Sequence, residues 1–99
     1  MPQPISNAYV RDLDRRYVFH SWSTQGNLDP LVIAGGQGCR LWDHDGREYL
    51  DFSSQLVFTN LGHQHPKVVA AIQAQAASLA TVAPATANLM RGEAAKRIM

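Results

Sequence analysis

Hydrophobic residues at helical spacing predict a helix near the start of the chain. Tyr9, Leu13 and Tyr17 recur every four residues, so they lie on one side of a helix. Ser6 and Asn7 come just before this pattern, and either residue can cap a helix N-terminus. The sequence therefore predicts a short amphipathic helix that begins at one of these two positions.

Two further helices are predicted in the last third of the chain. Pro66 fits the first position of a helix, where its missing N–H group has no cost, and the apolar residues of segment 68–79 share one helical face. From residue 90 onward an apolar residue recurs every four positions, and Thr86 or Asn88 can cap this last helix.

Between these helices the pattern changes to that of β-strands. Residues 31–33 form a short β-favouring run, which the sequence GGQG interrupts. Residues 39–42 and 47–52 predict the two strands of a hairpin, and Gly46 in the connecting sequence DHDG suits the left-handed position of its turn. The apolar run 56–62 is a third strand-like segment. Taken together, the elements predict an α+β arrangement of helix, antiparallel meander and two helices.

The stretch GHQHP raises the question of a metal site. A closed zinc site needs about four ligands, usually in paired spacings. His63 and His65 are two residues apart, but the other candidates, His20, His44 and Cys39, form no matching pair. We therefore predict no metal site. The two histidines are interpreted as part of a strand-to-helix joint, where they bond the local backbone or pack.

Three other motifs have equally simple interpretations. GGQG leads into a strand-like segment rather than a helix, so it predicts a tight turn and not a phosphate-binding loop. DHDG has Phe52, not glutamate, at the position where a calcium loop needs its last ligand. Lys67 and Lys96 lie among polar or basic neighbours, whereas an activated lysine needs a desolvated or cationic pocket, so neither is predicted to be catalytic.

Composition narrows the class of protein. The 99 residues are 45% hydrophobic and 17% charged, with a net charge of +1, as in an ordinary globular domain. The basic residues are scattered, which argues against a nucleic-acid partner, and no apolar stretch approaches the ~20 residues of a membrane span. The N-terminal segment, with Pro2 and Pro4, is not a secretory signal. One cysteine, Cys39, fits a reducing compartment, so we expect a cytoplasmic protein.

Residues 38–75 closely resemble the N-terminal signature of the class III (fold type I) pyridoxal-phosphate-dependent aminotransferases, often called ω-transaminases. The shared parts are a glycine, a short strand, D-x-x-G, a strand ending in Asp, then G-H-x-H-P and a helix. In this chain they are Gly38, Trp42, Asp43, Asp45, Gly46, Tyr49, Leu50, Asp51, Gly62, His63, His65 and Pro66. The segment FHSWSTQ, residues 19–25, resembles the N-terminal active-site segment of the family.

The resemblance implies an α/β enzyme that is a homodimer and several times longer than this chain. Residues 1–62 would be the N-terminal part of its small domain, and residues 63–99 the helices that lead into the large domain that binds pyridoxal 5'-phosphate (PLP). The last helix reaches Met99 without a C-cap residue, which also leads us to expect an N-terminal fragment.

The implied activity is transfer of an amino group from an amino acid or amine to a 2-oxo acid such as pyruvate, by a ping-pong Schiff-base mechanism with PLP. The lysine and the other groups that hold PLP in the family would lie beyond residue 99. No catalytic or cofactor-binding residue is therefore assigned here, and we expect the fragment alone to be inactive.

By position, the resemblance assigns substrate binding to three residues. Trp22 matches an aromatic residue at the substrate entrance, and Leu56 and Val57 match residues above the cofactor. Many relatives carry tryptophan where Val57 stands, so the substrate class stays open. The alternatives are a loop anchor for Trp22 and a place in a strand core for the other two. The connector 82–86 corresponds to a segment that reaches the active site of the neighbouring subunit.

Two other functions remain open at this point. The chain can be a non-catalytic interaction module that kept the shape of the small domain. Alternatively, the full protein can be an aminomutase, racemase or decarboxylase on the same scaffold. The downstream reading frame separates the first alternative from a transaminase, and product analysis separates the second.

Overall fold

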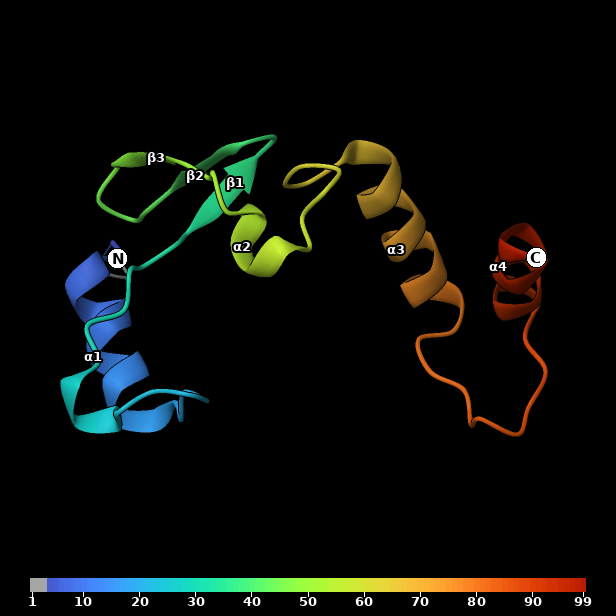
Figure 1. The fold of residues 1–99 in the computed structure, drawn as a ribbon, viewed down its shortest axis with the longest axis horizontal. Coiled ribbons are helices and arrows are strands. Elements are labelled where there is room, and N and C mark those ends of the chain that lie inside the picture. Colours follow the sequence, from blue (N-terminus) through green and yellow to red (C-terminus); the bar gives the residue numbers. More distant parts are fainter. Residues whose placement is uncertain (1–3) are drawn as a thin grey trace. The chain divides into compact units, whose positions relative to one another are not determined.

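The computed structural model describes residues 4–99, and residues 1–3, with Pro2 among them, lie outside the described residues (Figure 1). The chain forms two compact units, residues 1–65 and residues 66–99, which are described separately. The predicted order of an N-terminal helix, a three-stranded antiparallel sheet and further helices is confirmed. The predicted domain boundary after residue 62 stays a prediction.

The first helix, α1 (Asn7–Tyr17), begins at one of the two predicted caps. The Ser6 hydroxyl accepts a hydrogen bond from the backbone N–H of Tyr9, at 3.3 Å, so Ser6 is the N-cap residue. Arg16 donates to Asp12, one turn earlier, at 3.0 Å. The N-terminal end of the helix contacts the sheet region, because the backbone N–H of Asn7 donates to Asp45 at 3.1 Å.

The sheet of the first unit contains β1 (Gly35–Gln37), β2 (Arg40–Trp42) and β3 (Glu48–Leu50), antiparallel in the order β1-β2-β3. The predicted hairpin is confirmed: the sequence DHDG connects β2 to β3, and Gly46 has a φ angle of 88°. At the centre of the sheet, Leu41 is paired with Gly36 on one side and Tyr49 on the other.

The first strand lies four residues later than predicted. The β-favouring run 31–33 is not part of a strand, and the first two glycines of GGQG, predicted to form a tight turn, are in β1 instead. The reason is the space their neighbours occupy. A Cβ atom on Gly36 would lie 2.8 Å from Leu41 Cδ2, and one on Gly35 would lie 2.8 Å from the Trp42 indole. The turn itself comes after β1, at Gly38, whose φ angle is 61°.

The predicted third strand over residues 56–62 is wrong. Residues 54–57 form a short helical turn, α2 (Ser54–Val57), which a second turn follows. Their backbone bonds are local: the N–H groups of Phe58 and Thr59 both donate to Ser54 O, at 3.1 and 3.3 Å. A continuous apolar run does not distinguish a strand from a helical segment, which explains the error.

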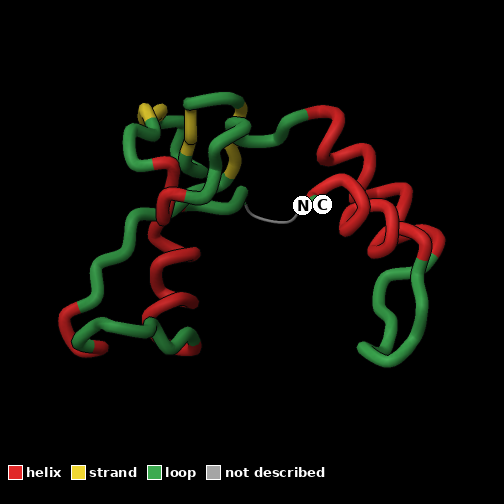
Figure 2. The backbone as a smooth tube through the Cα atoms, turned by 45° about the vertical axis from the view of Figure 1, so that its right-hand side comes forward, coloured by secondary structure: helices red, strands yellow, loops and turns green. Residues whose placement is uncertain are grey.

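The second unit contains α3 (Pro66–Ser78) and α4 (Leu89–Ile98), joined by a loop (Figure 2). Pro66 is the first residue of α3, as predicted. Asn88, one of the two predicted caps, accepts a hydrogen bond from the backbone N–H of Arg91 at 3.2 Å. The Arg91 guanidinium binds the carbonyl groups of Pro84 and Thr86, at 3.1 and 3.0 Å, and so ties the loop to α4.

The buried core is small for a chain of this length. Val32 and Leu41 are buried, with 5% and 7% of their surface exposed, whereas Phe52 is 91% exposed and Tyr17 78%. Most large apolar side chains in the described residues are therefore at the surface of their unit. Among these residues, no helix combines the length and the apolar character needed to cross a membrane.

Candidate functional site

Two segments of the first unit meet at the turn between β1 and β2. The backbone N–H of Asp51 donates to Cys39 O at 2.8 Å. His63 forms a two-way backbone bridge with Gly38, with N···O distances of 2.8 and 2.9 Å. Because neighbouring residues of one turn hold both backbones, the side chains of Asp51 and His63 are brought together.

The side chains of Asp51 and His63 form a short, shielded hydrogen bond. His63 Nε2 lies 2.6 Å from Asp51 Oδ2, and the two side chains are 16% and 5% exposed, respectively. The histidines were predicted to bond the local backbone or pack, and for His63 the partner is instead a carboxylate twelve residues away. The signal that sequence reasoning missed is the aspartate that ends the second hairpin strand.

Gly62 allows this approach of the two segments. Its φ angle is 82°, in the left-handed region, and a Cβ atom there would lie 3.2 Å from Gly38 Cα and 3.3 Å from Gly38 O. Any side chain at position 62 would push the Gly38 bridge apart. The stretch GHQHP therefore acts as a structural joint. Within residues 4–99, no group of three or more His, Cys, Asp and Glu side chains gathers in a way that could bind a metal ion.

Asp51 also holds the turn that follows it. Its carboxylate accepts from the backbone N–H and from the side-chain amide of Gln55, each at 3.2 Å, and from the Ser53 hydroxyl at 3.4 Å. The hydrogen bond from His63 lowers the pKa of Asp51 and, with help from Gln55, outweighs the opposing effect of burial, so the pKa falls to about 2. The carboxylate is therefore ionised at neutral pH.

The turn held by Asp51 has an unusual backbone. Ser54, Gln55 and Val57 have φ angles of 55°, 57° and 60°, and Gln55 combines its positive φ with a ψ of −112°. Positive φ is a clear outlier for a β-branched residue such as valine. Such conformations persist only where surrounding contacts impose them.

This turn carries two of the predicted substrate-binding residues. Leu56 is 69% exposed and Val57 is 80% exposed. The alternative prediction, that they belong to a strand core, is wrong in this structure. The adjacent residues Gln55 and Phe58 line a pocket of about 440 Å³, together with His63 and Trp42.

The third predicted residue, Trp22, lies on a different segment. It is 96% exposed and has a φ angle of 58°. Gln25 fixes its loop, because the Gln25 side chain accepts from the N–H of His20 at 3.0 Å and donates to Ser23 O at 2.9 Å. Figure 1 shows this loop at the end of α1 farther from the sheet, whereas α2 lies beside the sheet. Leu56 and Val57 therefore lie on one turn, whereas Trp22 lies on a separate loop.

A second buried carboxylate, Asp43, holds the hairpin turn. It is 4% exposed and accepts from the N–H groups of Asp45 and Arg47, at 3.0 and 2.8 Å, and from the Tyr49 hydroxyl at 2.8 Å. Burial by itself raises the pKa of Asp43. The hydrogen-bond donors around it, including Asn7, together have a larger opposite effect and lower the pKa to about 2. Asp43 resembles Asp51 in burial and bonding, but it is bonded to a different turn.

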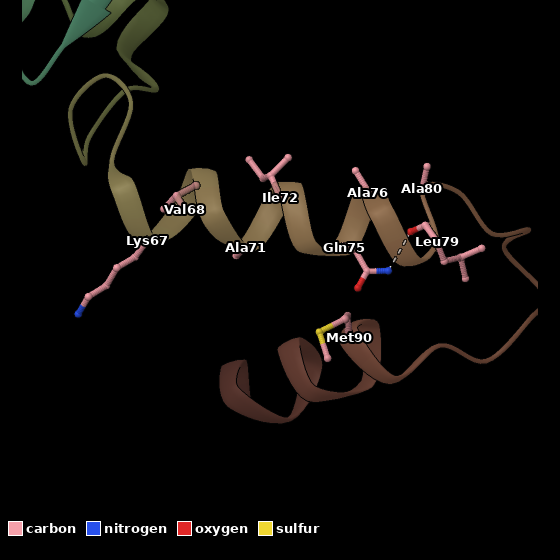
Figure 3. Close-up of a pocket in the computed structure, with 9 residues that line it drawn as sticks. All are labelled: Lys67, Val68, Ala71, Ile72, Gln75, Ala76, Leu79, Ala80 and Met90. Atoms are coloured by element: carbon pink, nitrogen blue, oxygen red, sulfur yellow. Dashed lines mark hydrogen bonds between the residues drawn. The ribbon is translucent and has the colours of Figure 1, made fainter.

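The second unit has an apolar groove of about 570 Å³ between α3 and α4 (Figure 3). Val68 and Ile72 of α3 and Met90 of α4 are among the residues that line it. The Lys67 side chain, at one end, extends away from the other side chains drawn in Figure 3. The groove has no cluster of polar groups that would orient a substrate.

Comparison with known proteins matches this architecture to one family. The family model described as "Aminotransferase class-III" matches residues 22–99. The chain belongs to the class III aminotransferases. Among curated members of this family, it is 50% identical over 50 residues to 4-aminobutyrate aminotransferase GabT of Escherichia coli. It is 58% identical, again over 50 residues, to acetylornithine aminotransferase of Myxococcus xanthus. Each match covers 50% of this chain and 12% of the relative.

Solved structures of aminotransferases show the same fold over almost the whole chain. A taurine:2-oxoglutarate aminotransferase from Bifidobacterium kashiwanohense, solved with PLP and glutamate, is 39% identical, with a TM-score of 0.86. The alignment covers 95% of this chain and 21% of that protein. An S-selective transaminase from Arthrobacter sp. has a TM-score of 0.85 at 34% identity and covers 96% of this chain. This class III aminotransferase chain therefore spans about one fifth of the length of these relatives.

Lysines and aspartates are the side chains of the described residues that could contact PLP directly, and their contacts do not fit that role. Lys67 and Lys96 are both exposed on helices, whereas a lysine that forms a Schiff base needs a desolvated or cationic pocket. Asp43 and Asp51 already accept several hydrogen bonds each, so neither is free to pair with a pyridine nitrogen.

Proposed function

We propose that the protein containing this chain is a PLP-dependent transaminase. It transfers an amino group from an amino acid or amine to a 2-oxo acid such as pyruvate. The observation that carries this proposal is the match, over 95% of the chain, to an aminotransferase solved with PLP and glutamate. The proposed cofactor is pyridoxal 5'-phosphate, which supplies an electron sink for the carbon that gives up its proton.

Within that reaction, the role proposed for this chain is substrate binding. Leu56 and Val57 contact the apolar part of the donor or acceptor, and Trp22 covers the substrate entrance. Support for Leu56 and Val57 comes from their place between Gln55 and Phe58, which line a pocket of about 440 Å³, together with their own exposure. Such side chains also exclude water from the reacting centre, which strengthens every polar contact there.

The groups that hold PLP are proposed to lie outside residues 1–99. Support comes from the two exposed lysines and from the share of the relatives that the chain spans, about one fifth. We therefore expect residues 1–99 alone to be inactive as a transaminase. We further propose that the full protein is a cytoplasmic homodimer, with small-molecule substrates and neither nucleic acid nor membrane as a partner.

The test uses the full reading frame that contains this chain, purified with PLP. Candidate donors are 4-aminobutyrate, N-acetylornithine and taurine, which the names of the relatives suggest. A transaminase changes the visible absorbance of its bound PLP when a donor is added, and an added 2-oxo acid restores it. Release of carbon dioxide, or an isomer of the donor as the product, would instead indicate a decarboxylase or an aminomutase. A protein that binds no PLP would contradict the proposal and favour the interaction module.

A further inference from the structure

We propose that Asp51 and His63 are positioning residues for the substrate pocket. They hold the turn Ser54–Val57 in the strained conformation that presents Leu56 and Val57. Because Leu56 and Val57 are pocket residues only by the proposed function, the effect on the substrate rests on that function. The effect on the turn itself does not.

The turn Ser54–Val57 needs an external restraint. Three of its four residues have positive φ angles, and none of the three is glycine. Gln55, with φ of 57° and ψ of −112°, lies in a region that side chains strongly disfavour. Without a restraint, the turn would relax and move the side chains of Leu56 and Val57.

Asp51 supplies that restraint at the most strained residue. One carboxylate oxygen accepts from the Gln55 backbone N–H, and the other accepts from the Gln55 side-chain amide. Because Asp51 binds both the backbone and the side chain of Gln55, it fixes the orientation of that residue. The Asp51 side chain is only 5% exposed, so its carboxylate is held in place by its protein partners, whereas Gln55 is at the surface and depends on Asp51 for its orientation.

His63 fixes the carboxylate in turn. Its Nε2 atom donates to the Asp51 oxygen that also accepts from the Gln55 amide. Its own backbone is bonded twice to Gly38, and the backbone of Asp51 is bonded to Cys39. The pair therefore connects the β1–β2 turn of the sheet to the turn that carries the pocket side chains.

The decisive variant is Asp51→Asn, with Asp43→Asn as its matched control. Both substitutions replace a buried carboxylate that accepts hydrogen bonds from a turn and has a pKa of about 2. In Asp51→Asn an amide N–H group replaces one of the acceptors that face His63 and Gln55. Asp43→Asn loosens the hairpin turn, which carries no predicted substrate contact. Loss of stability alone would affect both variants, whereas loss of positioning would affect only the first.

The first measurement follows the turn directly, by hydrogen–deuterium exchange in the full-length holoenzyme. In Asp51→Asn, we expect the exchange rate of the peptide covering residues 52–60 to rise by at least about tenfold, because an asparagine side chain keeps one acceptor oxygen and cannot satisfy both the Gln55 backbone and the donors on the other oxygen, so the turn opens more often. In Asp43→Asn the same peptide should exchange as in the unmodified protein. This measurement requires no activity, so it tests the restraint even if the protein proves not to be a transaminase.

The second measurement follows catalysis with two amino donors that differ in the size of their apolar part. Displacement of reacting groups by about 1 Å can cost on the order of 100-fold in rate, so we expect kcat/KM of Asp51→Asn to fall by roughly 10- to 100-fold. The loss should be unequal for the two donors, because Leu56 and Val57 contact the variable part. Asp43→Asn should keep the same donor preference as the unmodified enzyme.

Substitution of His63 provides the rescue test and does not depend on Asp51→Asn folding. Gln at position 63 places an amide donor near the position of Nε2, whereas Leu places none. We expect His63→Gln to retain most of the donor preference and of the protection at residues 52–60, and His63→Leu to lose both. Equal behaviour of these two variants, or equal exchange in Asp51→Asn and Asp43→Asn, would overturn the inference. Absence of transamination in the unmodified holoenzyme would overturn the proposed function instead.

Discussion

Replacing single glycines with alanine tests how the Gly38–Gly62 approach shapes the first unit. Three glycines form a graded series. Gly26 has no atom within 4 Å of an added Cβ atom and no positive φ angle. Gly46 has a φ angle of 88° but equally open space, and Gly62 has both a φ angle of 82° and a Cβ position 3.2 Å from Gly38 Cα. Each step in the series adds one physical cost.

The expected losses of stability follow from these costs. At Gly26, alanine only restricts the unfolded chain, which stabilises a protein by about 0.4–1 kcal/mol. At Gly46, the left-handed conformation costs alanine roughly 1–2 kcal/mol, partly offset by that same gain. At Gly62, the backbone of Gly38 must also move, and overpacking of this kind adds about 1–3 kcal/mol. Gly62→Ala should therefore lower the free energy of unfolding by about 2–4 kcal/mol, clearly more than Gly46→Ala.

The series can be read from urea unfolding of the full-length protein, followed by tryptophan fluorescence. Trp42 is in β2 and reports on the sheet of the first unit. Midpoints should shift with little change in the slope, because the surface exposed on unfolding stays similar. Equal losses for Gly62→Ala and Gly46→Ala would show that the φ angle alone matters and would refute the close approach of residues 38 and 62. A gain for Gly62→Ala would refute the geometry of the joint altogether.

Three other predictions concern single side chains. The pKa values of Asp43 and Asp51 fall from 3.8 to about 2 on folding, so their contribution to stability is complete above pH 3.8 and is lost as the pH drops through about 2. Urea midpoints should therefore fall steeply as the pH is lowered across this range. The double variant with Asn at both positions should lack this part of the pH dependence. Asn88→Ala removes the α4 cap and should cost about 1 kcal/mol, whereas Thr86→Ala should have little effect on the helix N-terminus; the same urea assay distinguishes them. If Val57 lines the pocket, Val57→Trp should lower kcat/KM for a bulky donor by roughly 10- to 200-fold relative to a small one, and an unchanged ratio would place Val57 outside the pocket.

Elements that depend on neighbouring residues along the chain could be predicted from the sequence. The Ser6 and Asn88 caps, Pro66 at the start of α3, and Gly46 in the hairpin turn each depend on contacts within about four residues. A capping oxygen or a fixed φ angle acts on its own turn, so its sequence position carries the information. The helices and the hairpin were accordingly placed within a few residues.

Elements that depend on distant partners were misplaced. The sequence predicted a turn at the glycines of β1, because glycine is common in turns. The sequence pattern alone does not show which side chains pack beside them. In the structure, the Leu41 side chain and the Trp42 indole occupy the space beside Gly36 and Gly35, so only a residue without a side chain fits in this strand. The strand is specified by residues five and seven positions away, which no local propensity can detect.

The candidate site shows the same division between local and distant causes. The resemblance to class III aminotransferases singled out Leu56 and Val57, but their strand conformation was wrong. Their conformation is determined by Asp51, four residues before Gln55, and by His63, twelve residues after Asp51. The pair meets only because the β1–β2 turn binds both backbones, which in turn requires glycine at position 62. Through its bond to the Asp51 carboxylate, His63 of the GHQHP stretch thus helps to determine the conformation of the turn at residues 54–57. His63, the first histidine of this stretch, therefore acts on the residues proposed to bind substrate through the turn that carries them.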